Sequence, residues 1–162
     1  MTMANSSLLN NILTFEIDDP NSSFTFSDRL SRENGWSTEY SHRVILEYKK
    51  YIYLLCISGH PLTPSDQVDQ AWHLHLLYTR SYWIEFCRNT LSKDIHHEPT
   101  KGGNSEGEKF NDWYTKTKEL YKTEFNVEPP EDIWPSNKNR FNDTHFQRIN
   151  IKKNWVIKKY LV

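Results

Sequence analysis

The chain has 162 residues, which is enough for one compact domain with a single hydrophobic core. Its 20 basic and 21 acidic residues give a formal net charge of -1, which argues against a protein built around the phosphate backbone of nucleic acid. Two cysteines, Cys56 and Cys87, are too few for a disulfide framework, and we expect both to be reduced.

The sequence contains no candidate for a membrane-spanning segment or a secretory signal. The longest apolar run, residues 51–57, is far shorter than the roughly 20 residues that a membrane span needs. The N-terminus lacks the basic start and the small-residue cleavage site of a signal peptide. We therefore expect a soluble, cytoplasmic protein with no transmembrane segment.

The first predicted elements are an N-terminal arm and two helices. Residues 1–23 are expected to form an arm or a weak helix, because a short apolar patch precedes a turn-forming Asp-Pro-Asn sequence. A short helix follows, for which we predict Ser27 as the N-cap and Gly35 as the end. Apolar residues then recur at spacings of three and four, which predicts a longer helix between Ser37 and Gly59.

The next helix carries the histidines of most interest. Its start is predicted at Thr63, which would act as the cap, with Pro64 in the first helical position. Around Tyr78 the helix either breaks or continues, because a second set of apolar pairs recurs every four residues up to Leu91. A polar loop is expected over residues 92–105, since it contains one proline and two glycines.

The last part of the chain changes in pattern and in charge. Helical spacing predicts a helix from Glu106 to about Asn126, followed by an extended proline-rich segment. Residues 138–162 contain seven Lys or Arg against one acid, while the rest of the chain is net acidic, so this part is a separate electrostatic unit. Alternating apolar and polar residues from Phe141 indicate a small hairpin or an extended arm. The predicted architecture is an all-α domain over residues 24–137 with this basic C-terminal extension packed on it.

Four of the seven histidines lie within 25 residues: His73, His75, His96 and His97. Asp69 and His73 are one helical turn apart and project together, which allows one helix to present two ligands to one metal ion. His75 points roughly 200° away from His73 around the helix, so a buried, hydrogen-bonded histidine is as good an interpretation of it as a ligand.

A third ligand is expected from the loop, where adjacent residues of extended backbone point opposite ways. We favour His97 over His96 for this position, with little in the sequence to separate them. Two imidazoles and one carboxylate with open coordination positions are typical of catalytic zinc and of non-haem iron(II) sites. An open position would hold a water acidified by the ion for hydrolysis, or dioxygen if the ion is iron.

Two functions remain open at this point. The first is a helical domain that binds a divalent ion, zinc or iron, and acts on an unidentified small molecule. The second is a non-enzymatic domain, in which the histidines tie the loop to the helix and the basic extension or an aromatic surface contacts a protein partner. The two differ in coordination, because a structural ion would be fully ligated by protein and a catalytic one would not.

The stretch from Asp69 to His75 reads D-x-x-W-H-x-H and is followed by Ile95-His96-His97. These motifs resemble the glycine-rich-domain-containing protein family, in a bacterial branch, and the likeness extends from about Phe24 to Lys159. The resemblance implies a largely uncharacterised helical domain and supports treating the two histidine motifs as a site. It implies no particular activity.

Overall fold

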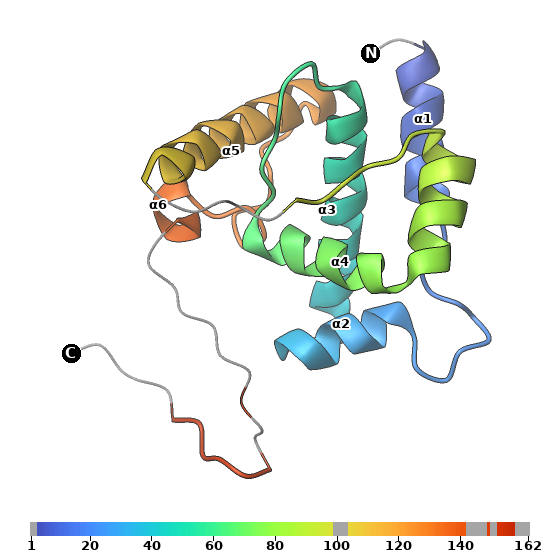
Figure 1. The fold of residues 1–162 in the computed structure, drawn as a ribbon, viewed down its shortest axis with the longest axis vertical. Coiled ribbons are helices and arrows are strands. Elements are labelled where there is room, and N and C mark those ends of the chain that lie inside the picture. Colours follow the sequence, from blue (N-terminus) through green and yellow to red (C-terminus); the bar gives the residue numbers. More distant parts are fainter. Residues whose placement is uncertain (1–2, 99–103, 142–148, 150–151, 158–162) are drawn as a thin grey trace.

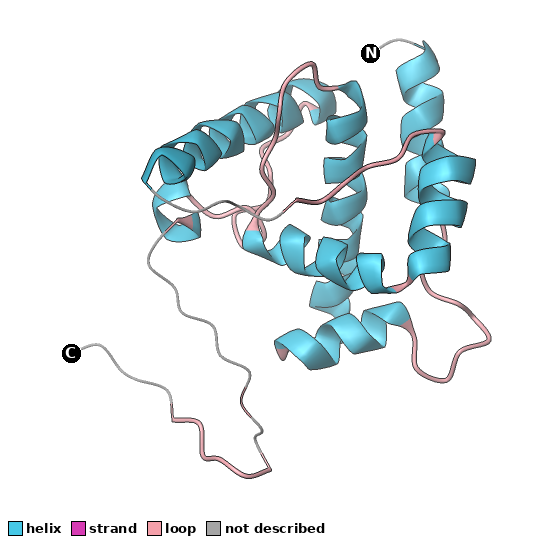
Figure 2. Ribbon diagram, in the orientation of Figure 1, coloured by secondary structure: helices cyan, strands magenta, loops and turns pink. Residues whose placement is uncertain are grey.

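The structure is a computed structural model that describes residues 3–98, 104–141, 149 and 152–157. Helices and no strands occur in these residues, so the predicted all-α fold is confirmed (Figures 1 and 2). The helices are α1 (Met3–Thr14), α2 (Phe26–Asn34), α3 (Thr38–Ile57), α4 (Asp66–Leu77), the π-helix η1 (Arg80–Leu91), α5 (Asn104–Phe125) and α6 (Asn137–Arg140).

Helix α3 is the centre of the fold. It contacts α1, α2, α4 and α5, and in Figure 1 α4 crosses it while α1 and α5 lie on opposite sides. Helix η1 packs beside both α1 and α4. The core between them is rich in rings, and its largest fully buried side chains include Tyr48, Tyr51, Tyr53, Tyr82, Tyr114, Tyr121, Phe26 and Phe86. Aromatic side chains therefore make up much of the core.

Helix α2 begins two residues earlier than predicted. Its N-cap is Thr25, whose side chain accepts from the Asp28 backbone N–H, while the Asp28 carboxylate accepts from the Thr25 N–H at 3.0 Å. The prediction of Ser27 as the cap was wrong because the Ser27 N–H is instead held by the Asp18 carboxylate at 2.8 Å, a contact with a more distant part of the chain. Gly35 ends the helix as predicted, with φ of 68°, in the left-handed region that glycine adopts without strain.

Helix α4 begins later than predicted. Ser65 is the N-cap and accepts a hydrogen bond from the Val68 N–H at 3.2 Å, so the prediction of Thr63 was wrong. The cause is a tertiary contact, because the Thr63 N–H donates to the Thr117 hydroxyl of α5 and is held outside the helix. This contact also joins the start of α4 to α5.

The histidine-bearing helix does not continue past Leu77. Helix α4 ends there, and after Tyr78 and Thr79 the chain forms η1, whose backbone bonds run from i to i+5. The apolar pairs that recur every four residues supply its buried side chains, among them Tyr82 and Phe86. The wider turn brings these rings against α4, where they surround His75.

The final helices anchor a non-helical segment. Helix α5 agrees closely with its prediction, and the proline-rich residues after it run without helix or strand and bury Ile133 and Trp134 in the core. Helix α6 was not predicted. The hairpin or arm expected from Phe141 onward falls largely outside the described residues. Residues 152–157, which the structure does describe, lie away from the helical body (Figure 1). No helix in the described ranges combines the length and apolarity that a bilayer crossing requires.

Candidate metal centre

Three of the predicted metal ligands, Asp69, His73 and His97, lie close together. Asp69 and His73 extend from neighbouring turns of α4, and His97 reaches them from the segment that follows η1. One ligand atom from each lies within 4.8 Å of the other two, and this is the group of potential metal ligands found in the described part of the chain. The Asp69 Oδ1 atom is 2.7 Å from His97 Nε2, and Asp69 Oδ2 is 3.9 Å from His73 Nε2.

These separations suit a small divalent ion. Ligand atoms about 2.0 to 2.2 Å from a tetrahedral zinc ion are roughly 3.4 Å from one another. The observed 2.7 and 3.9 Å, which involve the two different Asp69 oxygens, lie on either side of that value. The short Asp69–His97 contact is an N–H···O hydrogen bond, which an ion would replace with two coordinate bonds.

The position of His97 is set by a chain of hydrogen bonds and ring contacts. Its ring packs against the Trp72 indole with centroids 4.3 Å apart. The Trp72 Nε1–H donates to the Tyr82 hydroxyl at 2.9 Å, and that hydroxyl donates to the carbonyl of Ile95, two residues before His97. Tyr82 was not identified from the sequence, because only the packing of η1 on α4 brings it to the loop.

The other two candidate histidines lie elsewhere. The His96 ring lies 5.3 Å from the Trp83 ring and is not one of the three converging residues, although it borders the same pocket. His75 is fully buried, and its ring nitrogens contact the Tyr48 hydroxyl at 2.9 Å and the Ser81 hydroxyl at 3.1 Å. The loop pair therefore divides as extended backbone predicts, with one member at the centre and one packed beside it.

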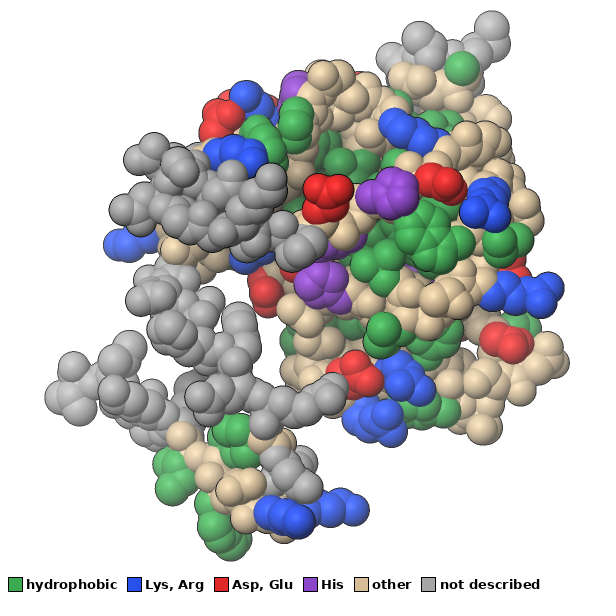
Figure 3. All heavy atoms as spheres, in the orientation of Figure 1, with side chains coloured by type: hydrophobic (Ala, Val, Ile, Leu, Met, Phe, Trp, Pro, Cys, Tyr) green, Lys and Arg blue, Asp and Glu red, His purple; other side chains and the backbone are tan. Residues whose placement is uncertain are grey.

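The converging residues open onto a pocket of about 960 Å³, which we call the aromatic pocket. Its wall consists of Tyr51, Leu55, Pro61, Leu62, Thr63, Pro64, Asp69, Trp72, His73, Leu76, Asp94, Ile95, His96, His97, Glu98, Phe110, Trp113, Arg140 and Phe141. Figure 3 shows histidine and acidic side chains close together beside hydrophobic ones near the middle of this face. A potential ion site thus lies at the edge of a large apolar space.

His75 has the geometry of a base beside a serine, but its environment argues against that role. Burial lowers its pKa to about 3, with a smaller contribution from Lys49, so the imidazole is neutral and weakly basic. Its two ring nitrogens contact the hydroxyls of Tyr48 and Ser81, so the neutral ring donates one hydrogen bond and accepts the other.

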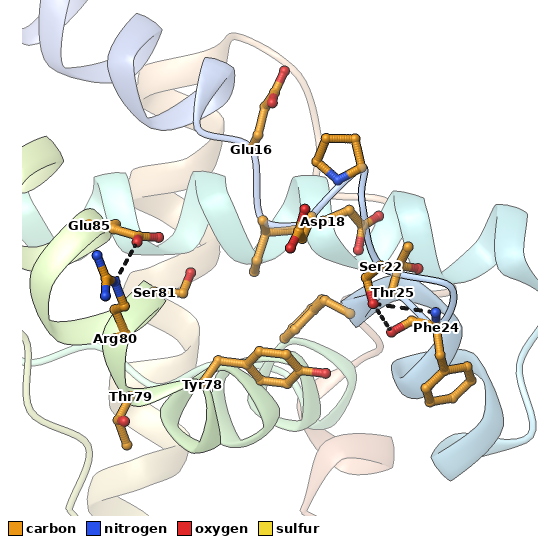
Figure 4. Close-up of a pocket in the computed structure, with 14 residues that line it drawn as sticks. Glu16, Asp18, Ser22, Phe24, Thr25, Tyr78, Thr79, Arg80, Ser81 and Glu85 are labelled. Atoms are coloured by element: carbon orange, nitrogen blue, oxygen red, sulfur yellow. Dashed lines mark hydrogen bonds and ion pairs between the residues drawn. The ribbon is translucent and has the colours of Figure 1, made fainter.

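A second pocket of about 620 Å³ lies on the other side of Ser81 (Figure 4). Glu16 and Asp18, from the segment after α1, line it together with Ser81 and Glu85. Glu85 is paired with Arg80 at 3.4 Å. The described residues of this pocket form no group of three potential metal ligands, so we place no site in it.

Comparison with known proteins identifies a family. No curated protein and no solved structure matches the chain. The UCP032817-like family matches residues 20–140, which include α2 to α6 and all three converging ligands. The resemblance to the glycine-rich-domain-containing family was therefore wrong, because the family model that matches these residues is a different one. The chain belongs to the UCP032817-like family, which is uncharacterised.

Proposed function

We propose that this protein binds one divalent ion, zinc or iron(II), through Asp69, His73 and His97 and uses it to act on a small molecule held in the aromatic pocket. The observation that supports this most strongly is the convergence of three ligand atoms within 4.8 Å, from two segments separated by η1, at the edge of a pocket of about 960 Å³.

Three protein ligands leave coordination positions for water and substrate, as in catalytic zinc sites. A water on zinc would be acidified for hydrolysis, and an iron(II) ion would instead offer the open positions to dioxygen. His73, whose side chain is 52% exposed, is the accessible ligand, whereas Asp69 and His97 are mostly covered. The ion would therefore sit between a rigid wall and the open pocket.

The test is metal content after purification without chelators, with the two loop histidines as a matched pair. We expect about one equivalent of zinc or iron in the wild type and in His96→Gln. His97→Gln and the double variant Asp69→Ala/His73→Ala should lose it, with the affinity of His97→Gln reduced by at least about 100-fold because a ligand is removed. Equal metal content in His96→Gln and His97→Gln would contradict this ligand set.

A second candidate function depends on the hydrogen bond between Asp69 and His97. The Asp69–His97 contact at 2.7 Å and the packing of His97 on Trp72 would by themselves hold the loop on α4 in a non-enzymatic interaction domain. In that case His97→Gln lowers the melting temperature while His73→Gln leaves it unchanged, and the wild type contains no metal even after reconstitution. Under the metal proposal, both variants instead lose the stabilisation that the ion provides.

A further inference from the structure

We infer that the ligand of the aromatic pocket is a small carboxylic acid with an apolar body, and that its carboxylate binds the guanidinium group of Arg140. This inference extends the proposed function by naming the class of molecule that the pocket accepts. Its anchor is separate from the ion, so the two proposals can fail independently.

Arg140 is the one Lys or Arg side chain in the described wall of the pocket. Its Nε–H donates to the Pro64 carbonyl at 3.2 Å, which holds the side chain at the start of α4, and its guanidinium lies 5.4 Å from the Phe141 ring centroid. No carboxylate among the described residues pairs with it. A guanidinium offers its two terminal amino groups in the planar arrangement that binds a carboxylate with two parallel hydrogen bonds.

The charges around the pocket favour an anion at Arg140. Asp69 would be neutralised by the ion, and Asp94 pairs with Arg88 at 3.8 Å. Glu98 also borders the pocket and is the remaining carboxylate of its described wall. Asp69 and Arg140 both act on the buried Tyr51 hydroxyl, Asp69 raising its pKa and Arg140 lowering it, while burial is the main cause of its raised pKa. The cationic end is thus near the ion site.

The remaining wall indicates an apolar body. The side chains that face a ligand between the two ends are mainly aliphatic and aromatic: Leu55, Leu62, Leu76, Ile95, Phe110 and Trp113. A volume of about 960 Å³ is at the upper end of the range for small-molecule pockets. Such a wall binds hydrocarbon or ring surface and gains little from a sugar or a peptide backbone, whose polar groups would be left without partners.

The test is calorimetric binding of phenylbutyrate and of its neutral analogue phenylbutanol. Both are titrated into wild-type protein and into the Asp69→Asn/His73→Gln variant, which lacks the proposed ion site. We expect the acid to bind roughly 10-fold or more tightly than the alcohol to both proteins, because a hydrogen-bonded charge pair is added. Arg140→Gln should abolish this preference, whereas Lys138→Gln, an exposed residue on the same helix outside the pocket wall, should leave it intact.

Two further measurements separate a lost contact from a damaged fold. Arg140→Lys keeps the charge and should keep part of the preference, and the indole N–H signal of Trp113 should shift on binding while that of Trp155, which is 98% exposed, should not. A preference that vanishes in the metal-site variant but survives Arg140→Gln would assign the carboxylate to the ion and overturn the inference. A preference that depends on Arg140, in wild-type protein that contains no metal even after reconstitution, would support the inference and overturn the proposed function. If neither phenylbutyrate nor phenylbutanol binds at millimolar concentration, the inference about the pocket's ligand is overturned.

Discussion

The imidazole of His75 is enclosed by five rings, those of Phe15, Phe26, Tyr48, Tyr82 and Phe86. Both of its nitrogens have hydrogen-bond partners, so the neutral ring is well accommodated and the charged ring is not. Nearby Lys49, whose amine donates to the carbonyls of Leu13 and Phe15, adds a further positive charge. Although it is only two residues from His73, His75 is a structural residue.

This burial predicts acid sensitivity. The pKa of His75 is about 3 in the folded protein and near 6.5 when unfolded, so the unfolded state alone binds this proton between those values. The contribution of His75 to stability is complete above pH 6.5 and decreases by about 1.4 kcal/mol per pH unit as the pH falls below that. His75→Gln should therefore be less stable than the wild type at pH 7, by a margin that narrows by roughly 2.5 kcal/mol at pH 4.5.

Urea unfolding of both proteins at the two pH values measures this margin. His60→Gln is the control, because His60 is exposed and its replacement should leave the free energy of unfolding within about 0.5 kcal/mol of the wild type at either pH. A margin for His75→Gln that is the same at pH 7 and pH 4.5 would show that the histidine does not titrate as its burial requires.

At the scale of the elements, a buried carboxylate joins α3 to α5 and to the segment after it. Glu47 on α3 is only 3% exposed and accepts from the Lys50 ammonium at 2.8 Å, the Tyr121 hydroxyl at 3.1 Å and the Trp134 indole N–H at 2.9 Å. Lys50 also donates to Tyr121, so each member of the network has a partner. The hydrogen bonds of this network fix α5 against α3. Helix α5 in turn supplies Phe110 and Trp113 to the aromatic pocket.

We predict that Glu47→Ala lowers the free energy of unfolding by about 3 kcal/mol, because it leaves Lys50 and two ring donors without their acceptor in the interior. Denaturant unfolding measures the loss. Glu39→Ala, in the exposed first turn of the same helix, should change stability by less than about 0.5 kcal/mol. Similar losses in the two variants would mean that the effect is on helix α3 itself and not on its connection to α5.

For the whole molecule, two tryptophans mark the difference between the core and the C-terminal segment. Trp134 is 3% exposed and stacks on Tyr114, whereas Trp155 is 98% exposed. Trp134→Ala should cost roughly 3 to 5 kcal/mol of stability, as loss of a large buried ring does, and Trp155→Ala should change it by no more than about 0.5 kcal/mol. Thermal melts compare them, and a marked decrease for Trp155→Ala would show that residues around it pack on the helical body.

Local sequence pattern by itself determined the class of fold and much of the candidate site. The spacing of apolar residues predicted α3 and α5, and the one-turn separation of Asp69 and His73 placed both on one face, because these features depend only on the geometry of a single helix. The choice of His97 from the loop pair agrees with the residues that converge, although whether they bind metal is still a prediction.

Only the tertiary structure decided the rest. The N-caps of α2 and α4 are Thr25 and Ser65 and not the predicted residues. The Asp18 carboxylate binds the Ser27 N–H, and the Thr117 hydroxyl binds the Thr63 N–H. Tyr82 entered the site through the packing of a π-helix, whose altered bonding no simple periodicity reveals. Arg140 lies at the pocket because its Nε–H bonds the Pro64 carbonyl across 76 residues of chain. Such tertiary contacts cannot be predicted from local sequence patterns, because the residues around each partner do not indicate which other residue it will contact.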